Sequence, residues 1–210
     1  MKIIAVANVE QQQEIMQKKM NAGCEMIFME SIDNIKSFNY DALFILSEPI
    51  HRNILKTITQ KPVIINSVIE PLDDLPENFS RVNGWSSFLQ RPVWEVATKN
   101  KMVSQVFEQL GWPVIFVSDE PGLVAARVIS MIINEAYFAL GEKVSTQQNI
   151  DLAMKLGTNY PYGPFEWAEK IGIKNIYRLL EKLTCLPDSQ AVTGKRYLIA
   201  PELKRIFSMK

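Results

Sequence analysis

The chain has 210 residues, 47% of them hydrophobic, and its 23 lysine and arginine side chains equal its 23 aspartate and glutamate side chains. This apolar share is enough for a hydrophobic core, and the balanced charge gives no net field that would favour nucleic acid or an anionic membrane. The two cysteines, Cys24 and Cys185, are too few for a disulfide scaffold and too far apart for a metal-ligand pair. We therefore expect both to be reduced and buried.

The opening residues lack the apolar run of a signal peptide, and no window reaches about 18 uninterrupted apolar residues. The sequence therefore predicts a cytoplasmic protein that contacts neither nucleic acid nor membranes.

Short apolar runs alternate with helical segments through residues 1–118. Strands are expected at 2–7, 24–29, 42–46, 62–65 and 113–117, and helices at 9–20, 50–58 and 102–110. This alternation predicts an α/β domain with a mainly parallel sheet.

The turn between the first strand and the first helix decides whether this domain can bind a dinucleotide. Such a turn normally reads G-x-G-x-x-G, because glycines let backbone N–H groups reach a pyrophosphate. Residues 7–12 contain no glycine, and Glu10 places a negative charge where a phosphate would lie. Glu30, after the second strand, stands where this fold carries the acid that binds an adenosine ribose, although a solvated carboxylate at a strand end would look the same.

Residues 119–210 predict an all-α domain. Asp119 can cap a helix, Pro121 suits its first turn, and apolar residues recur at helical spacing as far as Gly141. Ser145 and Gln148 have the spacing of a capping box. Three helices are therefore expected, at 121–141, 145–157 and 164–172.

The order of motifs in this half, D-x-P-G-L, N-E-A, D-x-A-M-K-x-G and Y-P-x-G-P-F-E, resembles the C-terminal domain of the 3-hydroxyacyl-CoA dehydrogenases, of the 3-hydroxybutyryl-CoA dehydrogenase kind. Arg196 to Ile206 also looks like that family's closing segment, so the resemblance covers nearly all of 112–210. The residues that carry it are Asp119, Pro121, Gly122, Leu123, Arg127, Glu135, Ala136, Asp151, Ala153, Met154, Lys155, Gly157, Tyr160, Pro161, Gly163, Pro164, Phe165 and Glu166.

The resemblance implies an NAD-linked oxidoreductase of fatty acyl-CoA metabolism, with an acyl-CoA ligand and a homodimer formed through the helical domain. It implies that residues 1–118 form a reduced Rossmann-like domain, in which at least one βα unit is missing or shortened to a loop. The predicted helix at 122–140 supports the homodimer, because it is apolar on more than one face.

The family's site can be carried over only in part. Its reaction uses a His base oriented by a Glu, with Ser and Asn groups that polarise the substrate oxygen. Ser86 falls where the His stands, Ala126 replaces the substrate Asn, and the single histidine of the chain is His51. His51 lies at the expected carboxyl edge of the sheet, where a base would be well placed, although a solvated helix-start residue would also be found there.

The candidate site residues are therefore of three kinds. They are Glu95, Ser86 and His51 for catalysis; Glu30, Glu48 and Lys56 for the cofactor; and Arg127, Asn66 and Ser67 for the substrate.

Two functions from different classes remain open. One is a divergent, compact 3-hydroxyacyl-CoA dehydrogenase, or an enzyme that uses Glu95 and Arg127 for another small-molecule reaction in the same cleft. The other is a non-catalytic member of the family that binds an acyl-CoA or a partner protein. The joint loss of the glycine turn, the base and the substrate Asn favours the second hypothesis.

Overall fold

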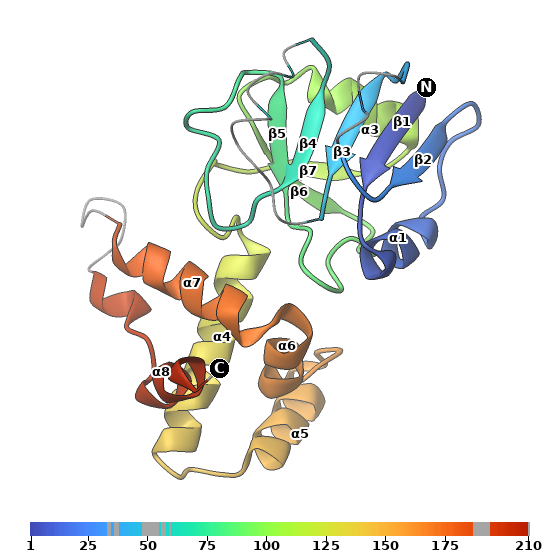
Figure 1. Cartoon of the computed structure of the whole chain (residues 1–210). Coiled ribbons are helices and arrows are strands. Elements are labelled where there is room, and N and C mark those ends of the chain that lie inside the picture. The colour runs from blue at the N-terminus through green and yellow to red at the C-terminus, as the bar shows by residue number, and fades with distance from the viewer. Residues whose placement is uncertain are drawn as a thin grey trace. The chain divides into compact units, whose positions relative to one another are not determined.

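The structure is a computed structural model that describes residues 1–32, 35, 38–47, 55, 58, 60–186 and 194–209 (Figure 1). The chain forms two compact units, residues 1–123 and 124–210, each of which is described by itself. The sequence placed this division at 118/119.

The first unit contains a seven-stranded sheet in the order β2-β1-β3-β4-β5-β6-β7. Its strands are β1 (Lys2–Val6), β2 (Glu25–Met29), β3 (Ala42–Ile45), β4 (Val63–Asn66), β5 (Phe79–Val82), β6 (Trp94–Thr98) and β7 (Val114–Phe116). Neighbouring strands are parallel except for β5 and β6, which are antiparallel. The mainly parallel sheet confirms the predicted α/β fold. The chain runs from β4 to β5 and from β5 to β6 without a helix at 67–78 or 83–93, so loops stand where a complete fold would carry helices.

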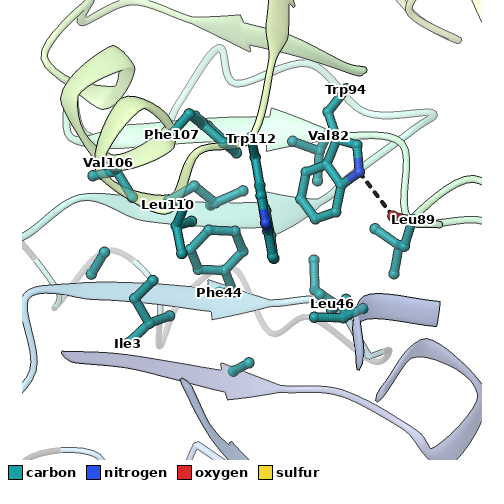
Figure 2. Packing of buried hydrophobic residues seen from close by; sticks show 14 of the residues in the cluster. Ile3, Phe44, Leu46, Val82, Leu89, Trp94, Val106, Phe107, Leu110 and Trp112 are labelled. Atoms are coloured by element: carbon teal, nitrogen blue, oxygen red, sulfur yellow. Dashed lines mark hydrogen bonds between the residues drawn. The ribbon is translucent and has the colours of Figure 1, made fainter. Parts of the chain in front are cut away.

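One face of the sheet is covered by α1 (Val9–Met16) and α3 (Val103–Leu110). Its centre is aromatic: the Phe44 ring lies edge-on to those of Trp94 and Phe107, with centroids 6.3 and 6.1 Å away. Figure 2 shows this cluster, in which Trp94 Nε1 donates to the Leu89 carbonyl at 2.9 Å. The indole therefore fills the core and fixes the loop after β5 at the same time.

The opposite face of the sheet carries a second hydrophobic core. Its buried apolar side chains include Leu43, Ile65 and Phe79 of the strands together with Leu72 and Leu75 of the loop after β4.

A buried arginine fastens these loops. Arg81 of β5 is 0% exposed, and its Nε donates to the carboxylate of Asp119. Its Nη1 donates to the Ser67 carbonyl at 2.9 Å, and its Nη2 donates to the Glu120 carbonyl at 2.5 Å. Asp119 also accepts the Leu72 N–H at 2.9 Å. The charge and the donors of the guanidinium are thus satisfied by segments 67–72 and 119–120.

This ion pair corrects the predicted start of the long helix. Asp119 does not cap that helix, because its carboxylate is taken by Arg81 and by the Leu72 N–H. Gly122 and Leu123 have φ of 84° and 49°, which interrupts a right-handed helix. The helix α4 therefore begins only at Ala125 and runs to Gly141.

The second unit is helical, as predicted. It comprises α4, α5 (Gln147–Thr158), α6 (Pro164–Ile171), α7 (Ile173–Thr184), a 3₁₀ turn (Gly194–Tyr197) and α8 (Pro201–Ser208). The side chain of Asn134 on α4 holds the segment before α8 in place. It donates to the Leu198 carbonyl and accepts the Ala200 N–H, both at 2.9 Å. Among the residues described in both units, no helix is long and apolar enough to cross a membrane.

Two other sequence predictions need correction. The cap of α5 is Thr146, whose hydroxyl accepts the Asn149 N–H at 3.3 Å, and the helix continues through Gly157 to a left-handed Asn159. Gly157 is exposed, so it costs about 1 kcal/mol of helix propensity without ending the helix. The cysteines are free, but Cys24 is half-buried and Cys185 is exposed.

We expect Asp119→Ala to lower the free energy of unfolding of the first unit by about 3 kcal/mol, because it removes the carboxylate that forms an ion pair with the buried Arg81 guanidinium. Urea denaturation followed by tryptophan fluorescence measures this loss. Arg205→Ala, which breaks the exposed pair with Glu202, is the control and should leave the transition unchanged. Equal shifts in the two variants would contradict the role of Arg81.

Candidate functional site

The carboxyl ends of β1, β3 and β4 form the sheet edge where open α/β folds bind their ligands. The first helix begins there with a capping box. Asn8 Oδ1 accepts the Gln11 N–H at 2.9 Å, and Gln11 Oε1 accepts the Asn8 N–H at 3.2 Å. The backbone donors that a pyrophosphate would need from these two residues are therefore already used.

Gln11 then spans the sheet edge. Its side-chain Nε2 donates to the Leu46 carbonyl at 2.7 Å, after β3, and to the Gly84 carbonyl at 3.2 Å, after β5. Gln11 is 7% exposed, so this amide lies inside the protein.

Asn66, at the end of β4, completes the set. Its Nδ2 donates to the same Leu46 carbonyl at 3.0 Å, and its Oδ1 accepts the Gly84 N–H at 2.9 Å. A Cβ on Gly84 would lie 2.6 Å from Asn66 Cγ, so only glycine permits this approach. We call the group formed by Gln11, Leu46, Asn66 and Gly84 the amide plug.

Glu14 holds the loop after β5 against α1. Its carboxylate is buried and accepts the N–H groups of Ser87 at 2.5 Å, Leu89 at 2.9 Å and Gln90 at 3.3 Å. Ser87 has φ of 71°, a left-handed conformation that is unfavourable for a residue with a Cβ. The hydrogen bonds to Glu14 offset that cost and keep residues 87–90 closed over the helix.

The structure separates the predicted catalytic residues. The Ser86 hydroxyl donates to Glu10, which is exposed in the first turn of α1. Glu95 is half-buried on β6 and alternates with Trp94 and Val96, whose side chains lie in the aromatic core. Burial lowers the pKa of Arg91, and the nearby Glu95 carboxylate opposes this by raising it.

The predicted substrate residues have structural roles or lie elsewhere. Asn66 belongs to the amide plug, and the Ser67 hydroxyl donates to the Glu70 carbonyl at 2.6 Å. Arg127 is half-buried on α4 of the helical unit, beside the fully buried Ala126.

Of the predicted cofactor residues, Glu30 is exposed after β2. His51, Glu48 and Lys56 lie outside the described residues.

The sequence did not predict that Gln11 and Glu14 have buried side chains that bond to the sheet edge and to the loop after β5. The spacing of Asn8 and Gln11 is that of a capping box and could have revealed the first. Nothing local distinguishes Glu14 from its exposed neighbours, because its partners are 73 to 76 residues away.

These residues do not fit a bound dinucleotide. The turn has no glycine, two of its N–H groups are used by the capping box, the buried Gln11 amide crosses the edge, and Glu10 adds a negative charge. A helix N-terminus attracts a phosphate through exposed N–H groups and a positive dipole, and here both are opposed.

Comparisons with known proteins agree with the architecture. Residues 122–208 match the family described as 3-hydroxyacyl-CoA dehydrogenase, C-terminal domain. The chain is 49% identical over 76 residues, 36% of its length, to an Escherichia coli 3-hydroxyadipyl-CoA dehydrogenase. It is 38% identical over 81 residues, 39% of its length, to a probable 3-hydroxybutyryl-CoA dehydrogenase of Bacillus subtilis. These alignments span 16% and 28% of the two relatives, well under two thirds of either.

Among solved structures, (S)-3-hydroxybutyryl-CoA dehydrogenase from Ralstonia eutropha matches with a TM-score of 0.73 at 18% identity, over 99% of this chain and 93% of that one. At this identity the likeness concerns the fold. The Escherichia coli 3-hydroxybutyryl-CoA dehydrogenase matches with a TM-score of 0.56 at 28% identity, over 70% of this chain and 31% of that one.

A mainly parallel sheet followed by a helical unit is the fold that this chain shares with the Ralstonia eutropha enzyme. The part of the chain that matches the C-terminal domain of the 3-hydroxyacyl-CoA dehydrogenases, residues 122–208, is its helical unit.

We expect Glu14→Ala to destabilise the first unit by about 3 kcal/mol, since three N–H groups lose a charged acceptor. Hydrogen exchange should accelerate at the amides of Ser87, Leu89 and Gln90. The matched control is Gln13→Ala, which truncates an exposed side chain of the same helix and should leave these amides protected. If both variants exchange alike, the loop is held by something other than Glu14.

Proposed function

We propose that this chain is a member of the family that performs no hydride transfer, and that it acts by assembly through its helical unit. The observation that carries the proposal is the amide plug, which fills the edge of the sheet where a dinucleotide would bind. Each amide in it satisfies buried groups of the protein itself. A dinucleotide would have to break these bonds and repay the desolvation of every group it left unpaired.

The acid–base chemistry is also unsupported by the described residues. Reduction of a 3-ketoacyl group needs a proton donor beside the substrate oxygen, and such a group contributes on the order of 10²- to 10⁴-fold of the rate. Ser86 stands in the position of the family base, and its hydroxyl is engaged by Glu10. Neither a serine hydroxyl nor an ordinary carboxylate is a competent base for a secondary alcohol near neutral pH. Ala126 offers no hydrogen bond to a substrate.

The helical unit supports assembly through α5. Asp151 is its single buried residue, while Leu152 and Leu156, one turn apart on the same face, are 53% and 78% exposed. Val144, just before the helix, is 70% exposed. On α4, by contrast, Ile133 and Tyr137 are buried within the unit. Exposed apolar side chains grouped in this way favour a protein contact, and we propose a homodimer formed around α5.

We expect calorimetry to detect no saturable binding of NAD or NADH up to about 1 mM, the upper range of ordinary enzyme KM values. We also expect no oxidation of NADH in the presence of acetoacetyl-CoA, measured by absorbance. Both results follow from the filled sheet edge and from the lack of a suitable base among the described residues.

A His51→Ala variant should be assayed for turnover beside the parent chain. Turnover by the parent chain that this substitution abolishes would identify His51 as the base and would overturn the non-catalytic proposal. Turnover that survives the substitution together with tight NADH binding would overturn it as well, because another group would then supply the proton.

We expect light scattering to give a dimer at micromolar concentration and Leu156→Glu to weaken it at least about tenfold, because a charge would be buried at the contact. Leu156 is exposed in the single chain, so the substitution should leave the unit folded. Met209→Glu, at a position 74% exposed outside α5, is the matched control and should remain dimeric. A monomeric parent chain, or dissociation by both substitutions, would contradict a contact around α5.

A further inference from the structure

The helical unit contains a hollow of about 410 Å³, a volume within the usual range of small-molecule sites. Its wall is built by α4, α5, α6 and the start of α7, with Ile206 of α8. The lining residues that matter here are Tyr137, Asp151, Phe165, Glu166, Glu169 and Ile173.

Every charged side chain that lines the hollow is acidic. Glu166 is neutralised by an ion pair with Lys155. Asp151 accepts the Phe165 N–H at 2.8 Å, and no cation of the described chain forms an ion pair with it. Burial and the neighbouring Glu166 carboxylate raise the pKa of Asp151, while the backbone hydrogen bonds that it accepts and the charge of Lys155 lower it. Glu169 is exposed at the rim and makes no ion pair within the same described ranges.

Tyr137 adds a polar group to the wall of the hollow. The residue is 5% exposed and lines the hollow, and its ring lies edge-on to Phe165 with centroids 5.0 Å apart. Its hydroxyl makes no hydrogen bond to any residue that the structure describes. Burial, with the charges of Glu202 and Asp151, raises the pKa of Tyr137 to about 12, so the hydroxyl stays neutral and its oxygen can accept a hydrogen bond. The side chain is thus held almost wholly inside the unit, while its hydroxyl keeps hydrogen-bonding capacity that a group in the hollow can use.

The geometry points to a binding site for an organic ammonium ion, with the ammonium group between Asp151, Glu169 and the Tyr137 hydroxyl and the alkyl part against Phe165 and Ile173. An ammonium carries three donors and no acceptor, which matches a wall of oxygen acceptors. The aromatic face of Phe165 offers further attraction to a cation.

A metal ion would suit this wall less well. In the described part of the chain, no three Asp, Glu, His or Cys side chains lie close enough to hold one. The hollow is also half apolar in character, since Phe165, Ile173 and Ile206 line it, so a cation that carries carbon is the better match. This site does not involve the sheet edge, whereas α5 contributes Asp151 to its wall and also carries the side chains of the proposed dimer contact.

The test is calorimetric titration of the full chain at pH 7 with n-butylammonium chloride and, separately, with n-butanol, a neutral molecule of the same length. We expect saturable binding of the ammonium and at least about tenfold weaker binding of the alcohol, because the alcohol forms no charge-assisted hydrogen bond. Equal affinities, or no saturable binding of the ammonium, would overturn the proposal.

Three variants locate the site. Asp151→Asn should weaken ammonium binding about tenfold, Tyr137→Phe about fivefold and Glu169→Gln about threefold. Glu169 is exposed, so its substitution does not threaten folding even if the buried changes do. Tyr160→Phe, at a partly exposed tyrosine that does not line the hollow, is the matched control and should bind as the parent does. If Glu169→Gln and Tyr137→Phe both fold and bind unchanged, the cation lies elsewhere and the proposal fails.

Discussion

Charges removed from water must be matched inside the protein, and in the α/β unit this constraint organises the segments that have no helix to order them. Arg81 and Glu14 are both buried, one cation and one anion, and each is satisfied by several groups from a loop. Arg81 fixes the loop after β4 and the segment before α4, and Glu14 fixes the loop after β5. A chain that replaces crossover helices by loops loses their internal hydrogen bonds, and these two side chains supply substitutes.

The same constraint explains why the sheet edge of this chain differs from a dinucleotide site. A phosphate site keeps its backbone donors exposed until the ligand arrives. Here the donors are used internally, and the side chains of Gln11 and Asn66 carry the bonding across the ends of β3, β4 and β5. The helical unit shows the opposite situation, because the Tyr137 hydroxyl and the Asp151 carboxylate face a hollow with their charge and hydrogen-bonding capacity incompletely used.

Sequence reasoning succeeded where local patterns dominate and failed where distant partners decide. Strands such as β1 and β3 are continuous apolar runs and were predicted within a residue or two. The strand β5 was not, because Ser80 and Arg81 occupy half of its four positions and the reason for burying an arginine lies in Asp119. The capping role of Asp119 was plausible from its neighbours and wrong for the same reason. Among the site residues, the missing glycines were visible in the sequence, whereas the bonds of Glu14 depend on the folded loop.

The mutual dependence within the amide plug also bears on the evolution of this chain. Gln11, Asn66 and the backbone of Gly84 share acceptors and donors, and Gly84 must lack a Cβ for Asn66 to fit. Replacing any one of them leaves a buried polar group of another without its hydrogen-bond partner. The effects of these substitutions on the free energy of unfolding are therefore coupled rather than additive. Substitution of these positions one at a time would therefore pass through a destabilised protein at each step. The arrangement acts as an epistatic constraint, in which each of the three positions is acceptable only in the presence of the other two.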